Sequence, residues 1–225
     1  MSPYPADHKF YRLPAGRRRA FQLRLGAAAA FGLLAWGGLL YLIWPGLLFL
    51  LFLTFGIILT VLAPFFDVPS MVRRGKLRYY SSFLLAEPVR DGIVTLHGGT
   101  LFDYYFTLAR EATGTRRKRE VVQGYLRGLL AILEEQPDTV VLRGTSYIMR
   151  PATAKRMGFR TVPADGLRGL TLVLNYLPLA ISLSFVRRRR TWPRIGRMRT
   201  YEASVGEIRK HRSYLEAILR RLDRS

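Results

Sequence analysis

The pattern of hydrophobic and polar positions is dominated by one stretch, residues 25–66, in which 42 consecutive residues carry no charged side chain. Trp44-Pro45-Gly46 divides it into residues 25–43 and 46–66, and a helix of about 20 apolar residues crosses a hydrocarbon core of about 30 Å. Pro45 removes a backbone donor and Gly46 permits a tight turn. The stretch therefore predicts a two-helix transmembrane hairpin that anchors the chain in a membrane. A hairpin buried in a soluble core is the alternative, and it fits this length poorly.

After the hairpin, short apolar runs alternate with turn signals. Gly98-Gly99 lies between two runs of β-branched and aromatic residues, which predicts a β-hairpin over residues 93–108. Apolar residues recur at helical spacing over residues 117–135 and define one face of a helix. The order is completed by a strand at Thr139–Arg143, a short helix between Pro151 and Gly158, and a strand at Phe159–Val162. This order predicts an α/β or α+β domain layered on one sheet.

Two later segments complete the predicted domain. Residues 170–186 form a second run without charge, interrupted by Asn175 and Pro178. A third crossing there would carry Arg187–Arg190 to the outside, against the positive-inside bias. We therefore expect core strands or a segment that lies against the bilayer, with a third crossing as the alternative. Residues 200–224 are predicted to form a C-terminal helix, in which Ser204 and Glu207 have the spacing of a capping box.

Charge divides the chain at the same boundaries. The head, residues 1–24, is a basic arm with six basic residues against one acidic residue, a net charge of +5. Its first 16 residues are predicted to be irregular, and the first helix is expected to enter the interface over Arg17–Arg24. The hairpin carries no charge, so +16 of the formal +21 belongs to the tail, residues 67–225. Basic clusters flank the hairpin at Arg17–Arg24 and Arg73–Arg78, and positive flanks stay in the cytoplasm. We therefore expect an integral protein of the plasma (inner) membrane with both termini cytoplasmic.

The basic clusters also indicate a partner. Lysine and arginine beside an anionic head-group layer contribute about 1 kcal/mol each. The residues expected to contact lipid head groups are Arg73, Arg74, Lys76, Arg78, Arg187, Arg188, Arg189 and Arg190. Charges that only set the topology are the alternative. Small residues in the hairpin, such as Gly37 and Gly56, would also permit self-association or packing on another membrane protein.

Candidate chemistry is confined to two glycine turns that follow apolar runs, residues 96–100 and 142–146. Backbone amides at such turns, with an arginine and hydroxyl groups nearby, can hold a phosphate. The residues in question are Gly98, Gly99, Thr100, Arg143, Gly144 and Thr145. His97 would act as a general base, Asp103 as its orienting partner and Ser146 as a nucleophile. Glycines that only the turns require are the alternative, and His8 and His211 are interpreted as isolated residues on basic surfaces.

Composition excludes several kinds of site and leaves three functions. The chain has no cysteine, which rules out disulfides, a thiolate nucleophile and cysteine metal sites. The carboxylates are scattered, so no metal or cofactor is expected. The favoured function is a membrane-anchored interaction or assembly module that rests on anionic lipid. The others are a membrane-bound enzyme acting on a phosphate-bearing, lipid-linked substrate at the His97/Arg143 turns, and a membrane-tethered nucleic-acid binder. Nucleic acid is not the expected partner, because no recognition motif is present.

Overall fold

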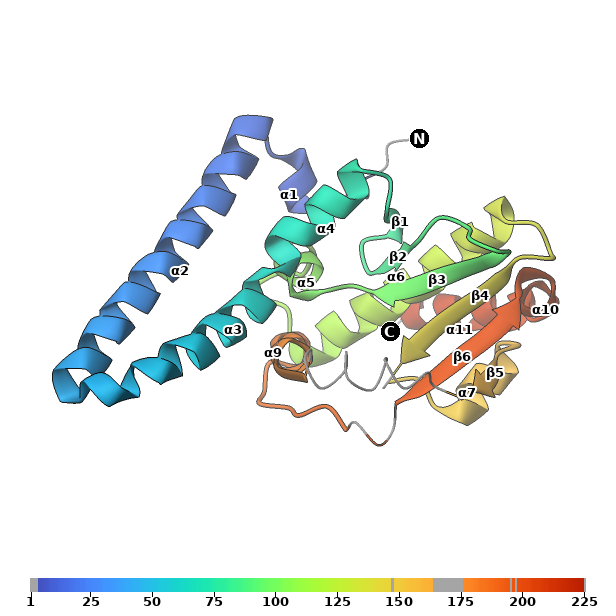
Figure 1. Ribbon diagram of the computed structural model, residues 1–225. Helices are drawn as coiled ribbons and strands as arrows, with labels where there is room; N and C mark the ends of the chain where they lie inside the picture. Colours follow the sequence, from blue (N-terminus) through green and yellow to red (C-terminus); the bar gives the residue numbers. More distant parts are fainter. Residues whose placement is uncertain (1–3, 147, 164–175, 195, 197, 225) are drawn as a thin grey trace.

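Two apolar helical segments followed by a mixed α/β domain make up the computed structural model, which describes residues 4–146, 148–163, 176–194, 196 and 198–224 (Figure 1). The first segment is α2 (Ala15–Ile43), and the second consists of the 3-10 turn η1 (Pro45–Phe49) followed by α3 (Leu50–Leu62). Both segments are long and apolar enough to cross a membrane. Trp44, in extended conformation, separates them at the predicted position.

The hairpin is closed both at its tip and at its base. Near the tip, Gly37 lies so close to Leu51 that an added Cβ would be 3.1 Å from the leucine side chain. At the base, the Gln22 side-chain amide donates to the Phe65 carbonyl oxygen at 2.9 Å. Phe65 belongs to α4 (Pro64–Arg73), which follows α3 with little interruption. The chain therefore leaves the hairpin as a helix.

A six-stranded mixed sheet forms the centre of the α/β domain, with the strand order β1-β2-β3-β4-β6-β5. The strands are β1 (Arg78–Ser81), β2 (Leu84–Ala86), β3 (Ile93–Gly98), β4 (Val141–Ser146), β5 (Arg160–Val162) and β6 (Arg199–Ser204). β3 and β4 run parallel, and the other described pairs are antiparallel. The crossover from β3 to β4 passes through α5 (Leu101–Thr107) and α6 (Gly114–Glu135). The predicted helix and the strands on either side of the Pro151 helix are thus confirmed.

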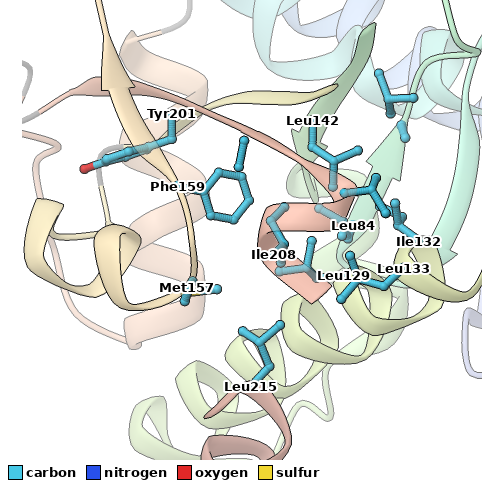
Figure 2. Close-up of a cluster of buried hydrophobic side chains, with 14 of the residues drawn as sticks. Leu84, Leu129, Ile132, Leu133, Leu142, Met157, Phe159, Tyr201, Ile208 and Leu215 are labelled. Atoms are coloured by element: carbon cyan, nitrogen blue, oxygen red, sulfur yellow. The ribbon is translucent and has the colours of Figure 1, made fainter. Parts of the chain in front are cut away.

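The core lies between the sheet and its helices. α6 packs against β1 and β2, α11 (Arg212–Arg224) packs against α6, and α10 (Val205–Lys210) connects β6 to α11. The short helix α7 (Pro151–Arg156) packs beside β5. The buried side chains of this core include Leu84, Leu129, Ile132, Leu133, Leu142, Met157, Phe159, Tyr201, Ile208 and Leu215 (Figure 2). The central strands also carry a polar row, in which Thr95, Arg143 and Glu202 are neighbours in register.

The predicted β-hairpin over residues 93–108 is wrong in its second half, because Leu101–Thr107 is the helix α5. Thr100 and Asp103 form a capping box, in which the Thr100 amide and hydroxyl donate to Asp103 Oδ2 at 2.7 and 2.9 Å. These bonds fix the first helical turn and outweigh the strand propensity of the aromatic residues that follow. β3 pairs with β2 and β4 instead.

Two predictions in the C-terminal third also change. Tyr176–Arg187 is the helix α9, so the strand interpretation of residues 181–185 is wrong, and residues 164–175 lie outside the described residues. The helix predicted over residues 200–224 is wrong at its start, because β6 continues to Ser204. The Glu207 amide donates to the Ser204 hydroxyl at 3.1 Å. The predicted cap therefore exists, and it marks the first residue of α10.

The described part of the head, from residue 4, contains a helix where an irregular arm is predicted. It contains the short helix α1 (Lys9–Arg12), and Phe10 is only 2% exposed. Phe10 shares a hydrophobic cluster with Phe65 of α4 and with Phe102 and Phe106 of α5. The head, the base of the hairpin and the α/β domain are therefore packed together around this aromatic cluster.

Candidate functional site

The two segments predicted as glycine turns lie on neighbouring strands in the centre of the sheet, because β3 and β4 pair in parallel. The carboxyl edge of parallel strands is where open α/β sheets bind ligands. The second predicted turn is wrong, because residues 142–146 belong to β4 and pair with β6 as far as Ser146. Gly144 pairs with Leu96 inside the sheet, and only Gly99 and Thr100 lie beyond a strand end. The hydrogen bonds and ion pairs of each side chain decide whether the carboxyl ends of β3 and β4 can bind a ligand.

His97 and Asp103 do not form the predicted dyad. His97 Nε2 lies 2.8 Å from Glu87 Oε1, and both side chains are partly exposed. Asp103 is completely buried and accepts a hydrogen bond from the Tyr79 hydroxyl at 2.5 Å. His97 therefore has a different carboxylate from the predicted one, and Asp103 is enclosed by other elements.

Asp103 is the centre of a buried polar cluster that joins the head to the domain. His8 Nε2 lies 3.4 Å from Asp103 Oδ1, and both side chains are 0% exposed. The interpretation of His8 as an isolated surface residue is thus wrong. The Tyr11 hydroxyl donates to the Tyr79 hydroxyl at 3.5 Å. Burial, reinforced by the charge of Asp103, raises the pKa of Tyr79 far above its ordinary value, and burial likewise raises the pKa of Tyr11. Both tyrosines therefore stay protonated, as this bonding requires.

Arg143 is committed to a carboxylate. Its Nε and Nη2 lie 2.8 and 2.7 Å from Glu202 Oε2, and Arg160 Nη2 donates to Glu202 Oε1 at 2.9 Å. The hydrogen bonds from Arg160 and then Arg143 lower the pKa of Glu202. The same polar row continues through Thr145, whose hydroxyl is 3.1 Å from that of Thr200. This cluster crosses three strands and holds them in register.

The backbone groups expected to hold a phosphate are also bonded within the chain. The Gly99 amide donates to the Phe83 carbonyl oxygen at 2.8 Å, and the Thr100 amide is used in the capping box. A Cβ on Gly98 would lie 2.5 Å from the Tyr125 hydroxyl, so close packing accounts for this glycine. Ser146 Oγ accepts hydrogen bonds from the Ile148 and Met149 amides. This geometry does not favour a phosphate cradle, and the catalytic assignments stay predictions.

The basic residues expected at the membrane fall into two groups. Arg78 is ion-paired with Glu135 and lies over the Tyr80 ring, and Arg188 donates to backbone carbonyl oxygens. Arg73, Arg74, Lys76, Arg187, Arg189 and Arg190 make no ion pair within the described ranges. Arg187 is the last residue of α9, which contacts α3, and Arg189 and Arg190 follow it. The other three lie at the end of α4 that points away from the hairpin (Figure 1).

Sequence reasoning missed the partners that complete these clusters. Glu87, Glu202 and His8 each meet a side chain from another element, and such pairing leaves no local spacing signal. In the part of the chain that the structure describes, no three His, Asp or Glu side chains are grouped to hold a metal ion.

Comparisons with known proteins identify no relative, because no family model, curated protein or solved structure matches the chain.

Proposed function

We propose that this chain is an integral membrane protein, anchored by its helical hairpin, whose basic α/β domain rests on anionic lipid as an interaction or assembly module. The exposure of the hairpin is the observation that supports this function. No residue of η1 or α3 is buried, and Gly37 and Leu40 are the buried residues of α2. A helix in the core of a soluble chain would instead be mostly buried.

The size of the exposed apolar surface favours lipid as its surroundings. Phe31 and Leu34 are 75% exposed, Leu42 is 83% exposed and Phe52 is 84% exposed. Removing one such side chain from water contributes about 1.5–3 kcal/mol. A hairpin that left these four side chains in water would forgo about 6–12 kcal/mol, which is comparable to the whole stability margin of an ordinary fold. A hydrocarbon layer supplies that burial.

The packing at the base of the hairpin supports a topology in which both termini lie on one side. Phe10 precedes the hairpin and Phe102 follows it, and their ring centroids are 5.0 Å apart. If the hairpin crosses the membrane twice, the head and the α/β domain must share a side. The basic residues of both flanks then assign that side to the cytoplasm, at the plasma (inner) membrane.

Charged substitutions at exposed hairpin positions test the anchor. Leu34→Arg combined with Phe52→Arg should remove the chain from the alkali-resistant membrane fraction, because each arginine at mid-membrane costs about 2.5–3.5 kcal/mol. On a water-exposed surface the same changes would be nearly neutral. Ala217→Arg, at an exposed position of α11, is the matched control. Retention of the double variant at the wild-type level would contradict the proposal.

A further inference from the structure

The position of α9 relative to the hairpin is unusual for a core helix. α9 packs against α5, α6 and the apolar helix α3. Figure 1 shows α9 nearly end-on, whereas α2 and α3 run across the picture. α9 therefore lies across the direction of the hairpin. Its 12 residues extend about 18 Å, which is too short to cross a hydrocarbon core of about 30 Å.

The two sides of α9 differ in burial. Pro178, Ser182 and Val186 recur at helical spacing and are buried against the neighbouring helices. Leu177 and Ile181 are one turn apart on the other side, and both are partly exposed. α9 carries no charged residue before Arg187. Its outer side therefore carries an apolar strip on a helix that contacts α3.

Both ends of α9 carry the residue types that concentrate at membrane interfaces. Tyr176 at its start stacks on Trp192 beyond its end, with ring centroids 6.1 Å apart, and Trp192 is 64% exposed. Arg187 is the last residue of α9, Arg189 and Arg190 follow it, and none of the three makes an ion pair among the described residues. Tyrosine, tryptophan and arginine combine an apolar body with a polar end, which suits the head-group layer.

The C-terminal end of α9 is fixed rigidly to the domain. Arg117, which is 5% exposed, donates from Nη1 to the Phe185 carbonyl oxygen at 2.8 Å, and its guanidinium lies over the Phe185 ring. Arg188 Nη1 donates to the carbonyl oxygens of Arg110 and Ala112. Gly114 approaches so closely that a Cβ would overlap the Arg187 carbonyl oxygen. The backbone that carries Arg187, Arg189 and Arg190 is therefore held at a defined position on the domain.

We infer that α9 lies in the plane of the membrane interface beside α3, with Leu177 and Ile181 toward the acyl chains, and that Arg187, Arg189 and Arg190 bind the phosphates of anionic phospholipids. This inference rests on the proposed membrane insertion of the hairpin. It also separates the predicted lipid contacts into two groups, because Arg73 and Arg74 lie where α4 ends, about 14 Å along its axis from Pro64. That distance exceeds the Debye length of about 8–10 Å at physiological salt.

Depth-dependent quenching tests the position of α9 in the full chain. Since the chain lacks cysteine, a single fluorophore can be placed at Ile181→Cys, at Leu34→Cys in the hairpin, or at Ala217→Cys on α11. In liposomes with brominated lipids, the Ile181 label should be quenched most by bromine near the head group. The Leu34 label should be quenched most by bromine deep in the acyl chains, and the Ala217 label by neither. An unquenched Ile181 label beside a quenched Leu34 label would overturn the inference alone. An unquenched Leu34 label would overturn the proposed function itself.

Matched charge removals test the arginines. Arg189→Gln with Arg190→Gln should lower the preference for phosphatidylglycerol over phosphatidylcholine by about fivefold per arginine. The preference is measured as the lipid ratio in discs excised from liposomes that contain both lipids. Arg73→Gln with Arg74→Gln removes the same charge at the far end of α4 and should leave the ratio unchanged. An equal fall in both variants, or no fall in either, would overturn the assignment of these arginines.

Discussion

Replacing Phe10 by alanine should release the head from the α/β domain. The Phe10 ring is 2% exposed and lies within 5.0–5.1 Å, centroid to centroid, of the rings of Phe102 and Phe106. These contacts join a segment that precedes the hairpin to one that follows it. The substitution therefore removes packing that the hairpin itself does not supply.

The free-energy cost of the Phe10→Ala substitution follows from the burial of the phenylalanine ring. Truncating a buried phenylalanine to alanine costs about 3–5 kcal/mol, from lost transfer free energy and the cavity left behind. At about 1.4 kcal/mol per tenfold, the open population of the head should rise roughly 100- to 4,000-fold. The buried polar cluster around Asp103 loses its cover in the same opening, since His8 belongs to the head.

Hydrogen exchange of the full chain in lipid discs measures this opening. The exchange protection of the amides of residues 4–14 and 101–107 should fall roughly 100- to 4,000-fold, while the amides of α11 should keep their wild-type protection. Phe31→Ala is the matched control, because Phe31 is 75% exposed on the hairpin and contributes nothing to docking of the head. Unchanged exchange in the Phe10 variant would refute the packing of the head on the domain.

Three further substitutions test individual parts of the fold, each by the melting temperature of the full chain. Glu202→Gln should destabilise by about 1–2 kcal/mol, because Arg143 and Arg160 lose a charged acceptor. The pKa of Glu202 is lowered in the folded chain. Its contribution to folding stability is therefore present above the ordinary glutamate pKa and is lost as the pH falls through the lowered pKa. The Glu202→Gln variant should lack this part of the acid dependence, and a wild-type acid dependence would contradict the ion pairs. Gly114→Ala should destabilise through overlap with the Arg187 carbonyl oxygen, whereas Gly26→Ala, with open space around it, should not; equal effects would refute the close approach of α6 and α9. Thr100→Ala should cost about 0.5–2 kcal/mol through loss of the cap, and a change no larger than in exposed Thr115→Ala would argue against it.

The elements that the sequence predicted correctly are those with a strong local signal. The hairpin follows from a long chargeless run with a proline near its middle, and α6 follows from apolar residues at helical spacing. α5 was missed because Phe and Tyr favour strands, although the spacing of Thr100 and Asp103 already carried a helix-start signal. The start of α10 was missed in the same way, since a cap at Ser204 excludes helix before it.

The bonding at the candidate site could not be read from spacing. His97, Arg143 and Asp103 each find a partner on another element, so only the assembled sheet shows that Glu87, Glu202 and Tyr79 are those partners. The parallel pairing of β3 and β4 places Leu96 beside Gly144, but the second predicted turn does not exist, because residues 142–146 continue as β4. The docking of the head has no sequence signal at all, because two aromatic segments separated by the hairpin must first fold toward each other.

The orientation of the hairpin is tested most directly by labelling single cysteines in intact cells with a membrane-impermeant maleimide. Suitable exposed positions are Lys9→Cys in the head, Pro45→Cys at the tip and Lys210→Cys in the α/β domain. Only Pro45→Cys should react from outside, and all three should react after permeabilisation. External labelling of Lys9→Cys or Lys210→Cys, or equal protection of all three positions, would contradict a hairpin that crosses the membrane twice and leaves both termini in the cytoplasm.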